Sequence, residues 1–319
     1  MITEFDIIKK YLKPLAKNDK NSLKLNDDIY FNFKNGTAIS LDTYIHGVHF
    51  INSSPEFFLK KVLRASLSDL FCKGIKPKHY FLSMSLNKKM LSSQWLKKVK
   101  RILETEQKKF NITLSGGDTT FSPKFSVTIV VLGYSKNKPV LRNTCKFNDD
   151  IYVTGNIGDS FLGLNVLKKK NNFNQYNDIF KKKFFEPDLP FKITPFLKKI
   201  ASSSIDISDG LSQDLSHLCS KKMFGAIIDL NKIPISTSTK VLLKKKKILL
   251  TDIFSNGDDY QVLFTSNIIN RSKITNLSKK INTKISRIGK IIRSNNIIYM
   301  DNGKNIILKA DKMGYTHSF

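Results

Sequence analysis

Segments typical of β-strands alternate with segments typical of α-helices along the whole chain. Apolar residues recur at helical spacing in residues 2–12, 54–72 and 92–110. The second of these begins with Ser54 and Pro55, which are typical of a helix N-terminus. This alternation predicts an α/β or mixed α+β fold made of packed layers. Strand patterns lie at residues 37–42, 79–86, 125–134, 151–154, 226–230, 260–265 and 285–291.

A polar segment that contains a proline, residues 135–150, separates two blocks that are rich in apolar residues. A chain of 319 residues is long enough to form two domains, each with its own core. We therefore predict an N-terminal domain of residues 1–137 and a C-terminal domain of residues 138–319. The glycine turn in residues 151–163 (IYVTGNIGDSFLG) either holds a phosphate or only connects a strand to a helix, because its spacing matches neither the Walker nor the Rossmann pattern.

The chain carries 54 Lys and Arg residues against 26 Asp and Glu, a formal net charge of +28 at pH 7. Such a charge can indicate nucleic-acid binding. Only six of the basic residues are Arg, and Asn and Ile are also abundant, a composition that A/T-rich codons alone can produce. The lysine runs at 168–170, 181–183 and 244–247 have no aromatic residues interleaved for base stacking, apart from the adjacent Phe184 and Phe185. We expect a solvated lysine-rich surface and no nucleic-acid partner.

The sequence also lacks the signals of membrane insertion and secretion. No apolar run approaches the roughly 18 residues that a membrane span needs, and the first residues alternate apolar with charged side chains. Cys72, Cys145 and Cys219 are far apart and form no CxxC pattern, which argues against a disulfide framework or a structural zinc site. We expect a cytoplasmic protein with no membrane partner.

Aspartates cluster in short patterns at predicted strand ends and glycine turns, and 21 of the 26 acidic residues are Asp. Each one alone fits a turn or a helix cap. If folding brings them together, their repulsion requires a cation, and magnesium prefers carboxylate oxygens and bridges them to phosphate. Together they predict a phosphate site with several magnesium ions. The patterns are Asp27-Asp28, Ser40-Leu41-Asp42, Ser66-Leu67-Ser68-Asp69, Gly116-Gly117-Asp118, Asp206-Ile207-Ser208-Asp209-Gly210 and Asn256-Gly257-Asp258-Asp259.

Other catalytic patterns are weak or absent. His46 and His49 form an HxxH pair, but this spacing on a strand would point them to opposite faces, and no third zinc ligand is suitably spaced. The GxSxG, HExxH, P-loop and protein-kinase catalytic-loop patterns do not occur. If the chain handles phosphate, metal ions must therefore supply what the backbone supplies in P-loop enzymes.

The same motifs, in their order, resemble those of the thiamine-monophosphate kinase family, within the superfamily of aminoimidazole ribonucleotide synthetase. The resemblance covers nearly the full length. Each motif alone is weak, the ordered set is specific, and the last motif favours the thiamine branch. The motifs are NDD (26–28), AISLDTYIHGVHF (38–50), LSDLFCKG (67–74), LSGGDTT (114–120), YVTGNIGDSFLGL (152–164), SIDISDGLSQDL (204–215), NGDDYQVLF (256–264) and MGYTHSF (313–319).

The resemblance implies a two-domain fold like that of aminoimidazole ribonucleotide synthetase, with the N-terminal sheets paired across a homodimer and ATP in the cleft of that dimer. It implies a kinase that phosphorylates thiamine monophosphate to thiamine diphosphate with ATP, by direct in-line transfer assisted by several Mg²⁺ ions. The resemblance implies magnesium ligands at Asp28, Ser40, Leu41 (through its backbone), Asp42, Asp69, Asp118, Asp206 and Asp209. It implies that ATP is bound by Gly117, Asp118, Arg142 and Ser208, and that thiamine monophosphate is bound by His49, Asp258 and Tyr315. The catalytic residues that it implies are Asp42, Asp118 and Arg142.

Three residues depart from the family pattern. Asn26 stands where Gly is usual, Leu41 replaces a Thr, and Asp258 replaces a Glu and is one methylene shorter. We expect these changes to affect substrate affinity more than reaction class. For His49, orienting the substrate phosphate and a purely structural place on a strand are both open. Two other functions also stay open: another ATP-using synthetase of the superfamily, and an RNA-binding protein on a degenerate enzyme fold.

Overall fold

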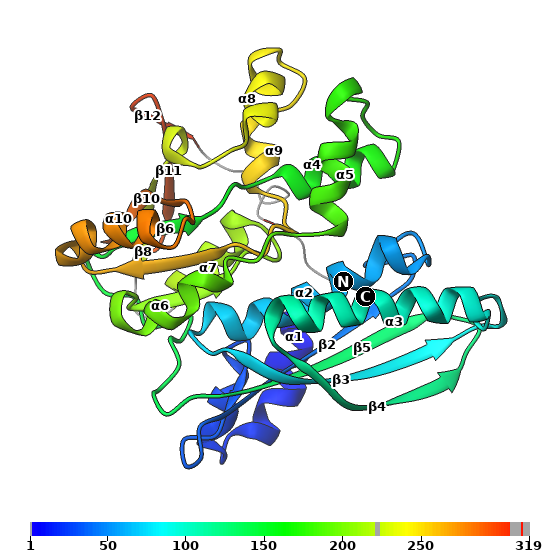
Figure 1. Cartoon of the computed structure of the whole chain (residues 1–319). Helices are drawn as coiled ribbons and strands as arrows, with labels where there is room; N and C mark the ends of the chain where they lie inside the picture. Colours follow the sequence, from blue (N-terminus) through cyan, green and yellow to red (C-terminus); the bar gives the residue numbers. More distant parts are fainter. Residues whose placement is uncertain (1, 221–223, 307–313, 315–319) are drawn as a thin grey trace.

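The computed structural model describes residues 2–220, 224–306 and 314, and its chain forms two β-sheets with helices packed against them (Figure 1). The first sheet has the strand order β1-β2-β5-β3-β4. Neighbouring strands are antiparallel except β3 and β4. Helices α2 (Pro55–Cys72) and α3 (Ser93–Phe110) cover one face of this sheet. The strands are β1 (Tyr30–Phe31), β2 (Thr37–Ile45), β3 (Pro77–Leu86), β4 (Thr113–Phe121) and β5 (Ser126–Tyr134).

Helix α2 lies between the two sheets and is buried along most of its length (Figure 1). Pro55 occupies its first turn, where a missing N–H costs no helical hydrogen bond. Phe58 and Val62 pack into the core of the first sheet, whereas Ser68 and Lys73 contact residues of the second sheet. One helix therefore connects both sheets.

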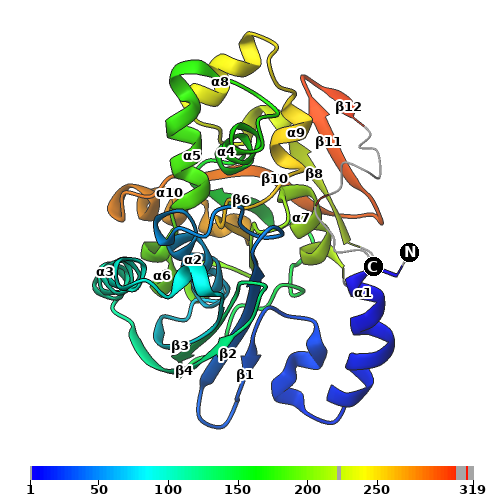
Figure 2. The same ribbon diagram turned by 90° about the vertical axis from the view of Figure 1, so that its right-hand side faces the viewer.

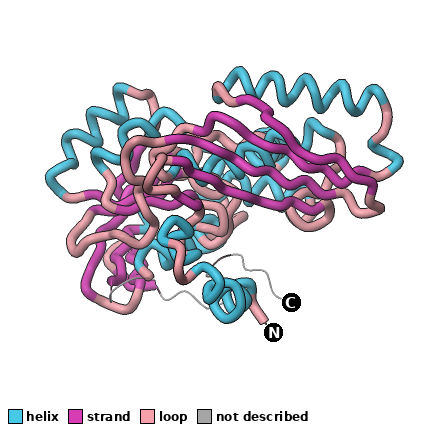
Figure 3. The backbone as a smooth tube through the Cα atoms, turned by 90° about the horizontal axis from the view of Figure 1, so that it is seen from below, coloured by secondary structure: helices cyan, strands magenta, loops and turns pink. Residues whose placement is uncertain are grey.

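The other face of the first sheet is largely open among the described elements (Figure 3). Leu41, Phe81 and Tyr134 are large apolar residues that are exposed on this face. Strand β1 pairs with Ala38 and Ile39, and Asn32 donates to the Thr37 carbonyl, so residues 40–45 of β2 have no described strand partner along that edge. The sheet thus combines an apolar face with an unpaired edge, which are features of a surface that packs against another chain.

The second sheet has seven strands in the order β12-β11-β8-β10-β6-β9-β7. Only β8 and β11 are parallel neighbours. The strands β6, β7 and β9 at one end lie closest to α2, which contacts β7 directly. The strands are β6 (Asp150–Thr154), β7 (Ser203–Asp206), β8 (Phe224–Asp229), β9 (Val262–Ser266), β10 (Ile285–Arg293), β11 (Ile297–Asp301) and β12 (Lys304–Ile306).

Helices cover both faces of the second sheet, because its central strands carry apolar residues on both sides. Tyr152 and Phe264 pack with the helices on one face, and Ile151, Val153 and Leu263 pack with those on the other. The first face carries α6 (Thr194–Ile200) and α10 (Arg271–Lys280), and the second carries α4 (Asp159–Leu167), α7 (Leu211–Cys219), α8 (Thr237–Lys244) and α9 (Leu250–Phe254), with α5 (Asn177–Phe185) packed on α4.

The N-terminal segment begins next to α7 and runs from there toward the level of the first sheet (Figure 2). Helix α1 (Glu4–Ile7) begins at Thr3, whose side chain accepts a hydrogen bond from the Asp6 N–H, and continues as a π-helical turn, residues 8–12. The ring of Phe5 lies 5.1 Å from that of His217 on α7. This contact fixes the segment against the second sheet.

The structure confirms the predicted fold class. The helices predicted at 54–72 and 92–110 are present, and the ends of the seven predicted strands differ from the observed ends by at most three residues. His46 and His49 were placed wrongly, because they lie in the turn after β2 and not on a strand. The first sheet ends at Tyr134 and the second begins at Asp150, and the domain boundary stays a prediction. None of the described helices has the length and apolar character of a membrane span.

The glycine turn after β6 connects this strand to α4. The N–H of Gly158 donates to the buried carboxylate of Asp259 at 2.8 Å. A carboxylate of the chain itself therefore occupies the anion position at the start of this helix. This contact supports the connecting role of the turn over phosphate binding.

Candidate active site

A cavity of about 1710 Å³ lies between the two sheets. Aspartates from both sheets, from α2 and α7 and from three loops line it, although they are far apart in the sequence. The site therefore exists only when the two sheets are packed on α2. Asp27 and Asp28 precede β1, Asp42 lies on β2, Asp69 on α2, Asp206 at the end of β7, Asp209 just before α7, Asp214 on α7, and Asp258 before β9.

Serine hydroxyls hold two of these carboxylates in place. Ser40 Oγ donates a hydrogen bond to Asp69 Oδ2. Ser68 Oγ donates to Asp206 Oδ2 at 2.5 Å and so links α2 to β7. Because a hydroxyl is neutral, these contacts orient the carboxylates and leave their negative charge uncompensated.

The clustered carboxylates resist ionisation. Burial raises the pKa of Asp69 well above its usual value, and the nearby Asp42 and Asp206 raise it further. Burial also raises the pKa of Asp206 to about 7 and that of Asp209 to about 6. A bound cation would offset both the cost of burying these charges and their mutual repulsion, since it favours the charged form of every carboxylate around it.

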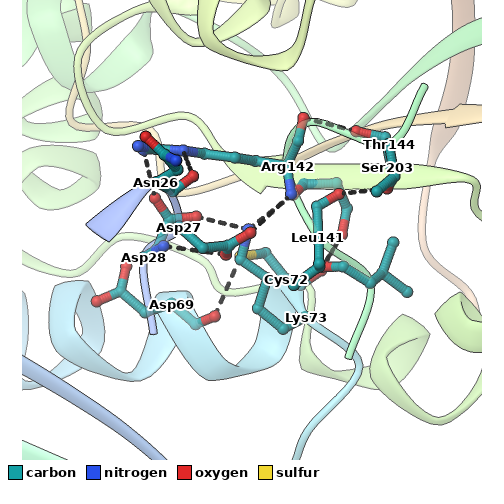
Figure 4. Close-up of polar contacts among 12 residues, drawn as sticks. Asn26, Asp27, Asp28, Asp69, Cys72, Lys73, Leu141, Arg142, Thr144 and Ser203 are labelled. Atoms are coloured by element: carbon teal, nitrogen blue, oxygen red, sulfur yellow. Dashed lines mark hydrogen bonds and ion pairs between the residues drawn. The ribbon is translucent and has the colours of Figure 1, made fainter. Parts of the chain in front are cut away.

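Two basic side chains meet the acids at one end of the cavity (Figure 4). The fully buried Lys73 places its Nζ 2.9 Å from Asp27 Oδ1 and 2.6 Å from Asp28 Oδ2, and donates to the Ser204 carbonyl at 2.8 Å. Arg142 Nη1 lies 3.1 Å from Asp28 Oδ1. Burial alone would raise the pKa of Asp28, but Lys73 and Arg142 hold it below its usual value. Asp28 is therefore ionised.

The donor atoms present fit a hard divalent cation. Ligand atoms of Asp28, Cys72 and Asp206 lie within 4.8 Å of one another. Asp28 Oδ2 is buried, and no hydrogen bond of good geometry reaches it despite the nearby Lys73 ammonium. The Cys72 thiol donates to the Asp69 carbonyl at 3.2 Å, and burial raises its pKa, so it stays protonated. The remaining donors are carboxylate oxygens, which suit magnesium.

Another part of the cavity holds one carboxylate and one ammonium, and the imidazole of His49 also belongs to the lining. Lys61 Nζ lies 2.9 Å from Asp258 Oδ2, and the Tyr260 hydroxyl donates to Asp258 Oδ1 at 2.8 Å. His49 Nδ1 accepts a hydrogen bond from the Ile45 N–H at 3.0 Å. A neutral His49 ring must therefore carry its proton on Nε2, which makes that atom a donor.

Comparison with known proteins identifies relatives of this chain. A family model described as "AIR synthase related protein, N-terminal domain" matches residues 26–135. The thiamine-monophosphate kinase of Buchnera aphidicola subsp. Acyrthosiphon pisum is 37% identical over 327 residues, which cover 99% of this chain and 98% of the relative. That of Haemophilus influenzae is 31% identical over 299 residues, with 90% and 89% covered. This chain belongs to the thiamine-monophosphate kinase family.

The fold agrees with this family. A solved structure described as "AaThiL complexed with AMPPCP and TMP" superposes with a TM-score of 0.83 at 23% identity, and covers 99% of this chain and 97% of its own. The likeness at this identity concerns the fold. It confirms the mixed α/β fold, like that of aminoimidazole ribonucleotide synthetase, that the resemblance implied.

Most residues that the family motifs assign to the site line the cavity. Gly117 and Asp118 do not belong to its described lining and lie on the exposed strand β4. Tyr315 falls outside the described residues. The roles of all these residues stay predictions. Those that line the cavity are Asp28, Ser40, Leu41, Asp42, His49, Asp69, Arg142, Asp206, Ser208, Asp209 and Asp258.

Sequence reasoning missed Lys61, Lys73 and Asp214. Lys61 lies on the same face of α2 as Asp69, and this spacing is the signal that could have identified it. Lys73 follows α2 and resembles any other lysine of a lysine-rich chain. Asp214 accepts the N–H of Gly210 at 3.1 Å and caps the turn that carries Asp209.

Proposed function

We propose that this chain transfers the γ-phosphoryl group of ATP to thiamine monophosphate, giving thiamine diphosphate and ADP. The observation that carries the proposal is the convergence of Asp28, Asp42, Asp69 and Asp206 at one cavity, in a chain of the thiamine-monophosphate kinase family. The structurally similar protein described in complex with AMPPCP and TMP supports both substrates.

The reaction brings together two anions, so charge compensation is its main demand. We infer that Asp28, Asp42, Asp69, Asp206 and Asp209 hold several Mg²⁺ ions. When bound, these ions would screen the repulsion between donor and acceptor and stabilise charge on the transferred group. The chain supplies the oriented carboxylates, in a buried place where their charge acts strongly.

Arg142 and Ser208 line the cavity beside the acids, and we assign them to the nucleotide. A guanidinium there would pair with phosphate oxygens. The acceptor needs no strong general base, because a phosphate monoester is largely ionised at pH 7 (second pKa about 6). His49 then acts as an Nε2–H donor that orients the acceptor phosphate.

We further propose that the active enzyme is a homodimer. Gly117 and Asp118 lie on the exposed strand β4 of the first sheet, and Asp118 shares the open face of this sheet with the exposed Leu41 and Phe81. The free edge of β2 offers main-chain groups to a second copy. In this arrangement the β4 residues of one copy would complete the cavity of the other.

The test is a coupled assay of ADP release with Mg²⁺, ATP and thiamine monophosphate, with bare thiamine and aminoimidazole precursors as control acceptors. We expect turnover that requires Mg²⁺ and the monophosphate. Turnover with another acceptor would favour a different synthetase of the superfamily. RNA affinity that falls steeply with salt, without any Mg²⁺-dependent turnover, would favour the RNA-binding alternative.

A further inference from the structure

Helix α2 presents three cavity-lining residues one turn apart, namely Lys61, Ala65 and Asp69. Residues four apart share one helix face, and eight residues span about 12 Å at 1.5 Å per residue. Asp69 lies among the acids, and Lys61 lies about two helical turns away from it. The small side chain of Ala65 between them leaves space along the helix.

Lys61 is an ammonium held in an apolar setting. Its side chain is only 3% exposed, and its Nζ lies 2.9 Å from Asp258 Oδ2 and 3.5 Å from the centre of the Phe184 ring. A buried ammonium is retained only where a carboxylate or an aromatic face compensates for lost water. Lys61 comes from the helix of the first sheet, whereas Asp258 and Phe184 belong to the second half of the chain.

Asp258 is held in one orientation. Its Oδ2 faces Lys61, and its Oδ1 accepts the hydroxyl of Tyr260 at 2.8 Å. The backbone is left-handed at Asp258 (φ 70°) and at Tyr260 (φ 50°), a conformation that non-glycine residues rarely adopt. Such strain persists where the surroundings fix it, and it is often found at functional sites.

We propose that Lys61 is a positioning residue that holds the Asp258 carboxylate toward the heterocyclic end of thiamine monophosphate. The proposal rests on the proposed function. The acceptor phosphate must lie near the acids, so the rest of the substrate extends past Ala65 toward Lys61 and Asp258. Each carboxylate oxygen accepts two hydrogen bonds, so Asp258 retains lone pairs for the amino group of the pyrimidine. A fixed carboxylate also compensates for the side chain that is one methylene shorter than Glu.

The experiment compares Lys61→Met with Lys60→Met. Methionine keeps an unbranched side chain of similar size beside Phe184 and removes the charge. Lys60 is the adjacent residue of α2 and pairs with Glu186 at 2.7 Å, so it controls for loss of a lysine from this helix. For K61M we expect the KM for thiamine monophosphate to rise at least tenfold, while kcat and the KM for ATP change less than twofold. K60M should match the wild type, and Lys61→Arg should recover part of the loss.

A double-mutant cycle with Asp258→Asn tests whether Lys61 acts through Asp258. We expect K61M/D258N to bind thiamine monophosphate no more weakly than D258N alone. The proposal would be overturned if the loss of affinity in K61M/D258N equalled the product of the losses in the two single variants. An unchanged KM for thiamine monophosphate in K61M, or a parallel rise in its KM for ATP, would also overturn it. Titration calorimetry with thiamine monophosphate gives the same comparison without turnover. If the wild type binds thiamine monophosphate but forms no thiamine diphosphate, the proposed kinase activity is refuted, and the binding data still decide the role of Lys61. If the wild type does not bind thiamine monophosphate, both the proposed function and the role of Lys61 are refuted.

Discussion

Asp42 and Asp118 project from opposite faces of the same five-stranded sheet. The strand register aligns Thr43 with Thr128, Thr128 with Ser83 and Ser83 with Asp118, so these four residues share one face. Asp42 precedes Thr43 and therefore points to the other face, toward α2 and the cavity. One chain cannot bring these two carboxylates to a single metal ion.

We expect Asp118→Ala to lower kcat by at least about 100-fold, as is common when a charge-stabilising group is lost, with an unchanged melting temperature, because the residue is exposed. Asp178→Ala, an exposed change on α5, serves as the control. A folded D118A protein with near-native turnover would refute the assignment.

Mixing two inactive variants tests the homodimer. If Asp42 and Asp118 of different chains form one site, exchange of subunits between D42N and D118A should restore about a quarter of wild-type activity, because half of the dimers then hold one intact site. ADP release after incubation of the mixture measures this. No recovery, despite proven subunit exchange, would contradict a shared site.

Asp69 should reduce the stability of the metal-free protein. Its buried carboxylate is repelled by Asp42 and Asp206. We expect Asp69→Asn to melt at a higher temperature than the wild type without Mg²⁺ at pH 8, to gain less from added Mg²⁺, and to lose turnover. Calorimetric scans with EDTA and with Mg²⁺ measure the difference. A lower melting temperature under EDTA would contradict the repulsion.

His217 should make the stability depend on pH. Burial, and then Arg142, lower its pKa to about 4, from 6.5, despite the opposing effect of Asp28. Between pH 6.5 and 4 the unfolded chain binds a proton that the folded chain does not. The free energy of unfolding should therefore fall as the pH drops through this window, by up to about 3 kcal/mol from this residue. Urea denaturation of the wild type and His217→Gln, without metal, should show a shallower fall for the variant.

The buried ion pair between Arg64 and Glu106 should matter for stability. Arg64 donates two hydrogen bonds of 2.7 Å to Glu106 and one of 3.0 Å to the Pro187 carbonyl. Glu106→Ala leaves a buried charge alone, so we expect a loss of about 3–5 kcal/mol. The exposed pair of Lys100 and Glu104, on the same helix, is the control, and Glu104→Ala should cost nothing measurable. Equal losses in urea denaturation would contradict this.

The sequence predicted the acids better than their partners. Asp42, Asp69 and Asp206 stand out because acids are scarce in this chain and follow apolar segments. Their convergence depends on the packing of two sheets against one helix, which periodicity does not encode. The face that Asp118 occupies depends on strand register across three pairings, and no local pattern reports this. Lys73 became recognisable only through its contacts with two carboxylates.

The contacts of α2 with β7 bear on how substrates reach the cavity. Lys73 and Ser68 connect this helix to Ser204 and Asp206 through buried hydrogen bonds. Separation of the two halves would break both of these buried hydrogen bonds, one of them from a charged amine. Ligand traffic must instead pass the rim, where the N-terminal residues 4–13 contribute to the lining. The exit of product would then be governed by that short segment, far from the atoms that react.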